Sequence, residues 1–100
     1  MQAARVTSLR VPPERVEEVS DVYRSTLVPP LQERVPSFSA LLLLVNEEAG
    51  SAIEIALFES EEDRRRTEED GGMLERKLEL LAAVLDEPPR LGTYQLKIIS

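Results

Sequence analysis

The hydrophobic pattern of the chain centres on one unbroken apolar run, FSALLLLV, which spans Phe38 to Val45. Successive side chains of a strand point to opposite faces, so a strand with this sequence is apolar on both faces. A short polar turn, 46–50, separates the run from a second apolar segment, 51–59, and together they predict a β-hairpin. A 100-residue chain rarely covers both faces of such a strand, so we expect helices on one face and a partner subunit on the other.

An amphipathic helix is predicted after Pro12-Pro13, because proline is tolerated in the first helical turn. Its apolar positions recur at spacings of three or four residues and form one stripe: Val16, Val19, Tyr23, Leu27 and Leu31. Pro29-Pro30 is predicted to end or kink this helix near Val28, since an interior proline costs about 3 kcal/mol. Residues 31–35 are expected to form a further short turn.

The second half of the chain predicts another helix and a final strand. Ser60 is followed by three acidic residues, a pattern typical of a helix N-cap and first turn. Gly71-Gly72 interrupts this helix, which resumes over 73–85 with a second apolar stripe: Leu74, Leu78, Leu81 and Leu85. Alternating segments at 4–11 and 93–99 predict the first and last strands.

The predicted order is strand, helix, strand, strand, helix, strand. This order is typical of a ferredoxin-like α+β fold, a four-stranded antiparallel sheet with both helices on one face. We expect a single domain of this kind over residues 1–100. In this topology the strand 38–45 lies at a sheet edge, where a long apolar strand invites aggregation unless something covers it. We therefore expect a homodimer.

The faces of the hairpin depend on its register. With Val45 opposite Ser51, a bulky aliphatic set suited to packing under the helices shares one face: Leu41, Leu43, Ile53, Ile55 and Leu57. The opposite face then mixes aromatic, small and acidic residues, as an interface or cavity wall does: Phe38, Ala40, Leu42, Leu44, Ala52, Glu54, Ala56 and Phe58. A bulge in the turn would change this assignment.

Composition excludes several kinds of chemistry. The chain has no cysteine, histidine or tryptophan, which removes disulfides, thiolate catalysis, zinc–thiolate sites and the commonest general base and haem ligand. We expect no metal site and no cofactor. A net charge of −7 disfavours nucleic acid and anionic membranes as partners. No apolar run has the length of a signal peptide or a membrane span, so a cytoplasmic location is expected.

Four short segments resemble the dimeric α+β barrel superfamily, in particular antibiotic-biosynthesis-monooxygenase-like domains: VPPE (11–14), PSF (36–38), LFESEED (57–63) and EPPRLGTY (87–94). Members typically enter the second strand with P-G-F, end the third with W-E-S-x-E and carry a tyrosine in the last strand. Here Ser37 stands in place of the glycine and Phe58 in place of the tryptophan. The resemblance covers nearly the whole chain and implies a dimer whose paired sheets form a barrel.

The resemblance also bears on activity. Haem-degrading relatives use a histidine ligand that this chain lacks, so haem degradation is not expected. Cofactor-free monooxygenase relatives surround an aromatic substrate with Asn, Trp, Tyr and Arg side chains, and the substrate supplies its own carbanion. Of these residue types only Tyr and Arg are available for a pocket here, since the single asparagine, Asn46, lies in the hairpin turn.

Four residues are candidates for a ligand-binding pocket: Tyr23, Glu54, Phe58 and Tyr94. In one interpretation the two tyrosine hydroxyls orient a phenol or carbonyl. In the other they belong to core or rim tyrosines that reach water or a backbone carbonyl. Glu54 lies between two isoleucines of a central strand, where desolvation would raise the pKa of its carboxyl group and make it a base. Alternatively, Glu54 pairs with an arginine such as Arg10 or faces water.

Two further motifs have both a functional and a structural interpretation. Arg64-Arg65-Arg66 is able to hold an anion, but the acidic residues around it favour a solvated, salt-bridged helix face. Gly71-Gly72 is either a lid hinge or a break between two helical segments.

The sequence predicts a dimeric α+β barrel domain that binds a small apolar or aromatic molecule. The alternative is a cofactor-independent monooxygenase or isomerase that acts on an aromatic, polyketide-like substrate, with Tyr23, Glu54 and Tyr94 as pocket groups. In a third interpretation, leucine and isoleucine side chains fill the cavity and the protein is purely structural.

Overall fold

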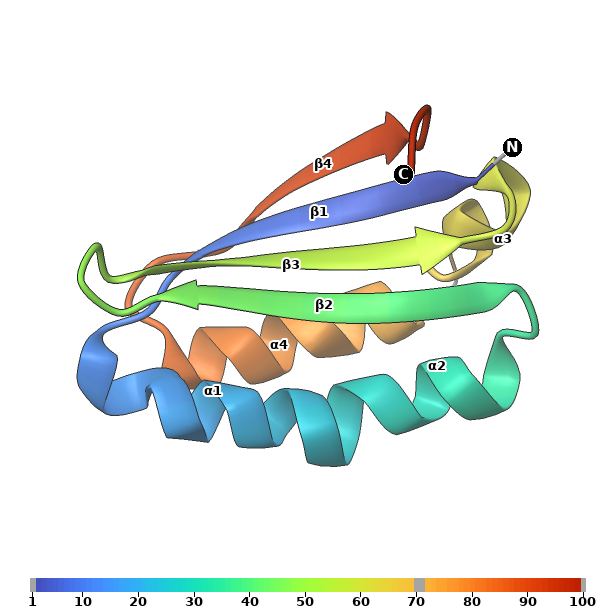
Figure 1. Cartoon of the computed structure of the whole chain (residues 1–100). Helices are drawn as coiled ribbons and strands as arrows, with labels where there is room; N and C mark the ends of the chain where they lie inside the picture. Colours follow the sequence, from blue (N-terminus) through green and yellow to red (C-terminus); the bar gives the residue numbers. More distant parts are fainter. Residues whose placement is uncertain (1, 70–71, 100) are drawn as a thin grey trace.

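A computed structural model describes residues 2–69 and 72–99 of the chain. The elements are β1 (Ala3–Arg10), η1 (Pro13–Arg15), α1 (Val16–Val22), η2 (Tyr23–Leu27), α2 (Val28–Arg34), β2 (Phe38–Asn46), β3 (Ser51–Phe58), α3 (Glu61–Arg66), α4 (Met73–Val84) and β4 (Arg90–Gln95). The strands form one antiparallel sheet in the order β2-β3-β1-β4, and the long helices lie side by side on one face of it (Figure 1). The predicted α+β ferredoxin-like fold, with β2 at a sheet edge, is confirmed.

The first helical stretch continues past Pro29-Pro30 to Arg34 instead of ending near Val28. A π-helical segment, η2, precedes the prolines, and the Val28 N–H donates to the carbonyl of Tyr23, five residues back. The prolines then occupy the first turn of α2, where a missing N–H costs little because such groups lack an α-helical partner. One helical stretch therefore carries the whole predicted apolar stripe, all of it buried: Val16, Val19, Tyr23, Leu27 and Leu31.

The hairpin pairs Val45 with Ala52 and not with Ser51, so the predicted faces of β3 are wrong. A shift of one residue moves every side chain of a strand to the opposite face. The buried side of β3 is the alternating set Ala52, Glu54, Ala56 and Phe58, whereas Ile53 is 43% exposed. The cause is a four-residue turn closed by Gly50 at φ +66°, a left-handed conformation that favours glycine. Asn46 accepts the Ala49 N–H at 3.0 Å and tightens this turn.

The face assignment of β2 is partly confirmed. Leu41 and Leu43 pack against the core as predicted. Phe38 joins them because the register shifts between Phe38 and Ala40, which places Phe38 beside Phe58 on the helix side. The two rings meet edge to face with centroids 6.0 Å apart, a favourable aromatic geometry.

The ends of the remaining elements follow local signals. Ser60 caps α3 as predicted: its Oγ accepts the Asp63 N–H at 3.2 Å and donates to the Asp63 carboxylate at 2.8 Å. β4 begins and ends earlier than the predicted 93–99, because its pairing with β1 runs from Arg90 to Gln95. No helix in the described ranges is long and apolar enough to cross a membrane.

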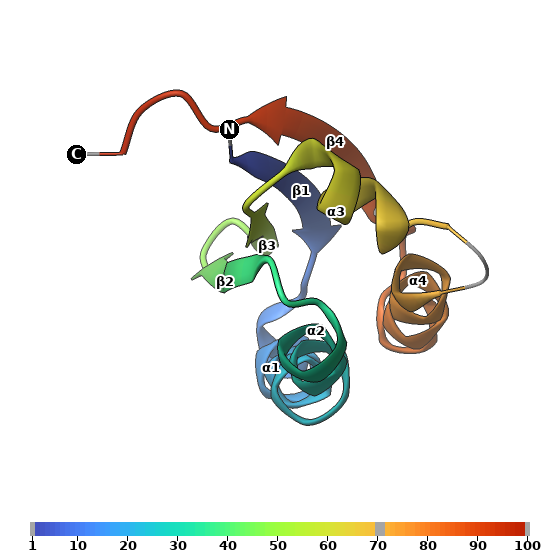
Figure 2. The ribbon, with the colours of Figure 1, turned by 90° about the vertical axis from the view of Figure 1, so that its right-hand side faces the viewer.

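The sheet face opposite the helices is apolar and is covered by no helix within residues 2–69 and 72–99 (Figure 2). The pairing register assigns to this outer face the side chains of Val6, Ala40, Leu42, Leu44, Ile53, Ile55, Leu57 and Tyr94. Leu44 is 54% exposed and Tyr94 is 59% exposed. Contiguous exposed apolar area of this kind typically marks an interaction surface.

Candidate functional site

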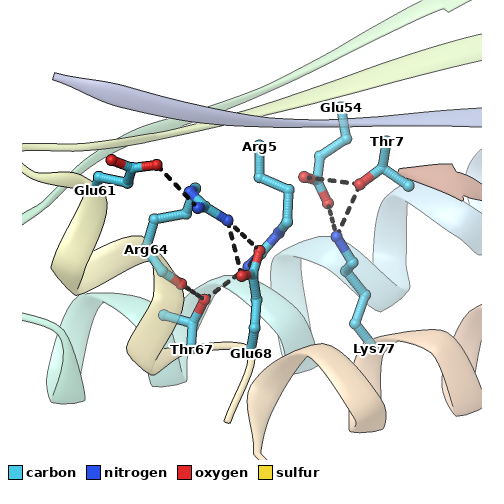
Figure 3. A network of polar contacts seen from close by, with 8 residues as sticks. All are labelled: Arg5, Thr7, Glu54, Glu61, Arg64, Thr67, Glu68 and Lys77. Atoms are coloured by element: carbon cyan, nitrogen blue, oxygen red, sulfur yellow. Dashed lines mark hydrogen bonds and ion pairs between the residues drawn. The ribbon is translucent and has the colours of Figure 1, made fainter. Parts of the chain in front are cut away.

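Polar side chains from β1, β3 and α4 meet in the interior between the sheet and the helices (Figure 3). Glu54 is completely buried on the helix side of β3. One of its carboxylate oxygens accepts from Lys77 Nζ at 3.1 Å, and the other lies 3.5 Å from the Thr7 hydroxyl. Lys77 Nζ also donates to Thr7 Oγ1 at 2.9 Å. The partner of Glu54 is therefore Lys77 and not Arg10, which lies on the surface 3.8 Å from Glu87.

Simple periodicities bring these groups together. Thr7 and Arg5 alternate along β1 with outward-facing residues, and Thr7 pairs directly with Glu54 across the two strands. Lys77 lies four residues after Met73 and four before Leu81, so it shares the sheet-facing side of α4 with both. Sequence reasoning missed Lys77, although its place in line with these apolar residues was the available signal.

A second polar group adjoins the first. Arg5 is buried, and its Nη1 donates to the Thr67 hydroxyl at 2.6 Å and lies 3.5 Å from Glu68. Arg64 donates to both oxygens of Glu68 at 2.7 Å. Arg64 is 6% exposed, so the prediction of a solvated, salt-bridged face is wrong about solvation at this position, although Arg64 does pair with Glu61 and Glu68. Its side chain instead ties α3 to β1 through the carboxylate that it shares with Arg5.

The other two arginines of this run behave as predicted. Arg65 and Arg66 are exposed, and each pairs with the acid four residues before it, Glu61 at 3.3 Å and Glu62 at 2.9 Å. Pairs of this kind stabilise an exposed helix by only a few tenths of a kcal/mol, about 0.3 to 0.5 each.

Burial dominates the electrostatics of the interior. It lowers the pKa of Lys77 and of Arg5, and the negative charge of Glu54 opposes that effect in both cases. Burial also raises the pKa of Tyr23 well above its ordinary value, and the nearby Glu54 carboxylate raises it further. The Tyr23 hydroxyl is buried and makes no hydrogen bond with the described residues. The surroundings of Glu54 thus include the cations Lys77 and Arg5 and the neutral phenol of Tyr23, in a medium of low polarity.

Two cavities adjoin these residues. The larger one, which we call the helix groove, has a volume of about 640 Å³ and lies between η2–α2 on one side and α3–α4 on the other. Its apolar lining consists of Leu27, Pro30, Val35, Pro36 and Met73. The smaller one, of about 20 Å³, holds roughly one water molecule and is bordered by Arg5, Glu54 and Lys77. Leu27 and Met73 line both cavities, so these two side chains separate the groove from the buried charges.

The structure brings together only some of the predicted site residues. Tyr23 and Glu54 are neighbours in the interior, although Tyr23 is not among the described residues that line either cavity. Phe58 is fully buried and lies under the Arg5 guanidinium, 5.6 Å from its ring centroid. Tyr94 is on the outer face, with its ring folded over Gly92, and so is remote from the helix groove.

The structure describes one of the two glycines for which a hinge or a helix break was predicted, Gly72. Gly71 lies outside the described residues, so the hinge hypothesis concerns a position that the structure does not describe. Gly72 is the N-cap of α4, where a Cβ would lie 2.8 Å from the carbonyl oxygen of Glu69. Among the described residues, no group of three ligating side chains is arranged to hold a metal ion.

Lys77→Met is expected to lower the free energy of unfolding by about 3 to 5 kcal/mol, because it leaves the buried Glu54 carboxylate without its counter-charge. The double variant Glu54→Gln/Lys77→Met removes both charges and should recover much of this loss. Urea denaturation at one fixed protein concentration measures both. Arg76→Met, at an exposed position of α4, is the matched control and should change stability by less than about 0.5 kcal/mol. A double variant less stable than Lys77→Met would contradict the ion-pair interpretation.

Stability is expected to fall as the pH rises above 10, because the unfolded chain releases the Tyr23 proton there while the folded protein, with its raised pKa, retains it. In Tyr94→Phe, Tyr23 is the single tyrosine, and its tyrosinate absorbance should appear only together with the loss of circular dichroism. Tyr23→Phe, which removes the buried phenol, is the control and should lose less stability above pH 10 than the wild-type protein. Reversible ionisation of Tyr23 in folded protein near pH 10 would contradict this account.

No protein-family model and no curated protein sequence matches this chain. Solved structures match it closely in fold. The monooxygenase of the gene ActVA-Orf6 of Streptomyces coelicolor, in complex with nanaomycin D, superimposes with a TM-score of 0.78 at 18% identity, over 99% of this chain and 89% of that one. A candidate antibiotic biosynthesis monooxygenase from Caulobacter crescentus gives 0.76 at 14% identity, over 97% and 91% of the two chains.

A third similar structure is SnoaB, a cofactor-independent oxygenase from Streptomyces nogalater, with a TM-score of 0.67 at 19% identity, over 98% of this chain and 95% of that one. At such identities the similarity establishes the fold and leaves the activity to be argued from the site. The chain therefore has the fold of the antibiotic-biosynthesis-monooxygenase-like proteins, as its sequence motifs indicated.

Proposed function

We propose that this chain binds a small apolar or aromatic molecule in the helix groove. The observation that carries the proposal is the groove itself, about 640 Å³ with Leu27, Val35 and Met73 in its wall. Small-molecule sites are typically apolar clefts of roughly 300 to 1,000 Å³ with a few convergent polar groups. A monooxygenase of similar fold from Streptomyces coelicolor is in complex with the ligand nanaomycin D, which supports a small-molecule ligand here.

The proposed working form is a homodimer joined through the outer face. Strands β2 and β3 present Leu42, Leu44 and Ile53 there, each more than 40% exposed. A second copy is the natural occupant, because the same apolar patch on both subunits is self-complementary under a two-fold axis. The resemblance to dimeric α+β barrel proteins supports the same arrangement. The same proposal includes a cytoplasmic location. It also excludes nucleic acid and anionic membranes as partners, on the strength of the net charge of −7.

A second candidate function is cofactor-independent oxygenation or isomerisation of an aromatic, polyketide-like substrate. It is favoured by Glu54 and Lys77, which border the small cavity. Leu27 and Met73 line both this cavity and the groove, so they separate the two charged groups from a ligand in the groove. Glu54 would take a proton from the substrate, and Lys77 would stabilise the resulting enolate oxygen. In the oxygenation of a methylene carbon, the carbanion adds to O₂, and water leaves as the new carbonyl forms. The assignment of SnoaB as a cofactor-independent oxygenase supports chemistry of this class on this fold.

The four candidate ligand-binding residues have different roles in these proposals. In the second candidate function Glu54 would be the base, and Tyr23 is its buried, neutral neighbour. Phe58 positions Arg5 beneath the small cavity through its ring. Tyr94 would contact the partner subunit across the outer face instead of the ligand in its own groove.

Ile53→Glu is expected to convert the homodimer to a monomer, because it would bury an unpaired carboxylate in an apolar interface. Sedimentation velocity measures the change against the 11.2 kDa chain mass. Ala83→Glu adds the same charge at an exposed position of α4 and should leave the dimer intact. A folded wild-type monomer at micromolar concentration would contradict the homodimer.

Anthraquinone is expected to bind in the helix groove and to shift amide NMR signals of Leu27, Val35 and Met73. Thr26→Trp fills part of the groove and should abolish this binding, whereas Ser25→Trp, exposed beside it and outside the groove, should not. Absence of binding, together with native mass spectra free of any retained molecule, would leave the purely structural interpretation.

Oxygen uptake with anthrone, whose oxidation gives anthraquinone and water, separates an oxygenase from a simple binding protein. An oxygenase predicts slower uptake in Glu54→Gln.

A further inference from the structure

The helix groove is positively charged although the chain as a whole is acidic. Three arginines line it: Arg34 at the end of α2, Arg66 on α3 and Arg76 on α4. Among the described lining residues, Asp63 is the one carboxylate. In a chain of net charge −7, this local excess of cations would attract an anion to the groove.

The three arginines differ in their partners. Arg66 lies 2.9 Å from Glu62 and 3.6 Å from Asp63, so two carboxylates compensate its charge. Asp63 is ionised at neutral pH, since the hydroxyls of Ser37 and Ser60 lower the pKa of its carboxyl group. The ion pairs found between described residues include neither Arg34 nor Arg76. Within residues 2–69 and 72–99, these two guanidinium groups, on opposite walls of the groove, have no carboxylate partner and are available to a ligand.

We propose that the ligand of the helix groove is an amphipathic anion, in which Arg34 and Arg76 hold the anionic group and the apolar wall holds the rest. This inference rests on the proposed function, because it assumes that the groove is the ligand site. A guanidinium is planar and presents paired N–H donors, which match the oxygens of a carboxylate, sulfonate or phosphate. Leu27, Val35 and Met73 supply the apolar surface for an aromatic body. The expected ligand is therefore an aromatic acid or an aromatic phosphate, in preference to a neutral hydrocarbon or a cation.

The depth of the groove adds a direction to this binding mode. Both arginines are exposed, whereas Leu27 is buried and Met73 is half-buried. Leu27 and Met73 are also the side chains that separate the groove from Glu54 and Lys77. The anionic group would thus remain near solvent at the entrance, and the aromatic body would point inward, toward the buried charges. This orientation keeps the ligand's negative charge away from the Glu54 carboxylate.

The test uses two fluorescent probes with the same aromatic body, anilinonaphthalene sulfonate and its uncharged counterpart N-phenylnaphthylamine. The sulfonate is expected to bind more tightly, and Arg34→Gln/Arg76→Gln should weaken it about tenfold while leaving the uncharged probe unaffected. Amide NMR shifts of the groove residues, as opposed to those of the outer face, locate each probe. The matched control, Arg24→Gln/Arg65→Gln, removes two exposed arginines outside the groove and should change neither affinity.

The outcomes separate this inference from the proposal on which it rests. If both probes bind in the groove equally well and the double substitution changes nothing, the anionic ligand class is overturned and the apolar ligand site stands. If neither probe shifts an amide signal of the groove in protein with native circular dichroism, both the anionic ligand class and the ligand site in the groove are overturned. Displacement of the sulfonate by naphthoate and by naphthyl phosphate then distinguishes a carboxylate ligand from a phosphate, according to which competes at the lower concentration.

Discussion

The buried contact between Glu54 and Lys77 is the constraint on which the rest of the structure depends. Moving a charged group out of water costs several kcal/mol, so both groups are tolerable only in each other's presence and with Thr7 as their shared partner. The contact sets the rotation of α4 about its axis. It also stabilises the register of β3 that the four-residue turn sets, because a slip of one residue would bring Ile53 under Lys77 and expose Glu54 on the opposite face.

The same constraint explains why the outer face is apolar. With Glu54 pointing toward the helices, the alternation of β3 directs Ile53 and Ile55 outward, where β2 and β1 add leucine and valine. Three polar residues of the central strands, Arg5, Thr7 and Glu54, are therefore inside, and much of the apolar surface is outside. This reversal is unfavourable for an isolated chain and would be resolved if a second copy covered the outer face, which is the physical basis of the proposed homodimer.

On the helix side, the fold places an open groove next to a charged interior and separates the two by Leu27 and Met73. Methionine is flexible and unbranched, so a ligand entering the groove can displace it at low cost. A cation in the interior is most effective when water is excluded, since charges interact more strongly in a medium of low polarity. Binding and catalysis are thus compatible with one site, and the difference between them lies in whether a substrate carbon reaches the Glu54 carboxylate.

The sequence by itself determined the order of the elements, the edge position of β2, the apolar stripe of the first helix and the Ser60 cap, because these follow from local periodicity and local hydrogen bonds. It also singled out Glu54, a carboxylate within an apolar strand. It did not determine which side chains of β3 face the helices, because an alternating sequence is compatible with either register until the conformation of the turn is known. Only the tertiary structure decided that Lys77 neutralises Glu54, that Arg64 is buried and that Tyr94 faces away from the groove. These outcomes depend on contacts between residues far apart in the chain, where packing and the cost of an unpaired buried charge select the partner.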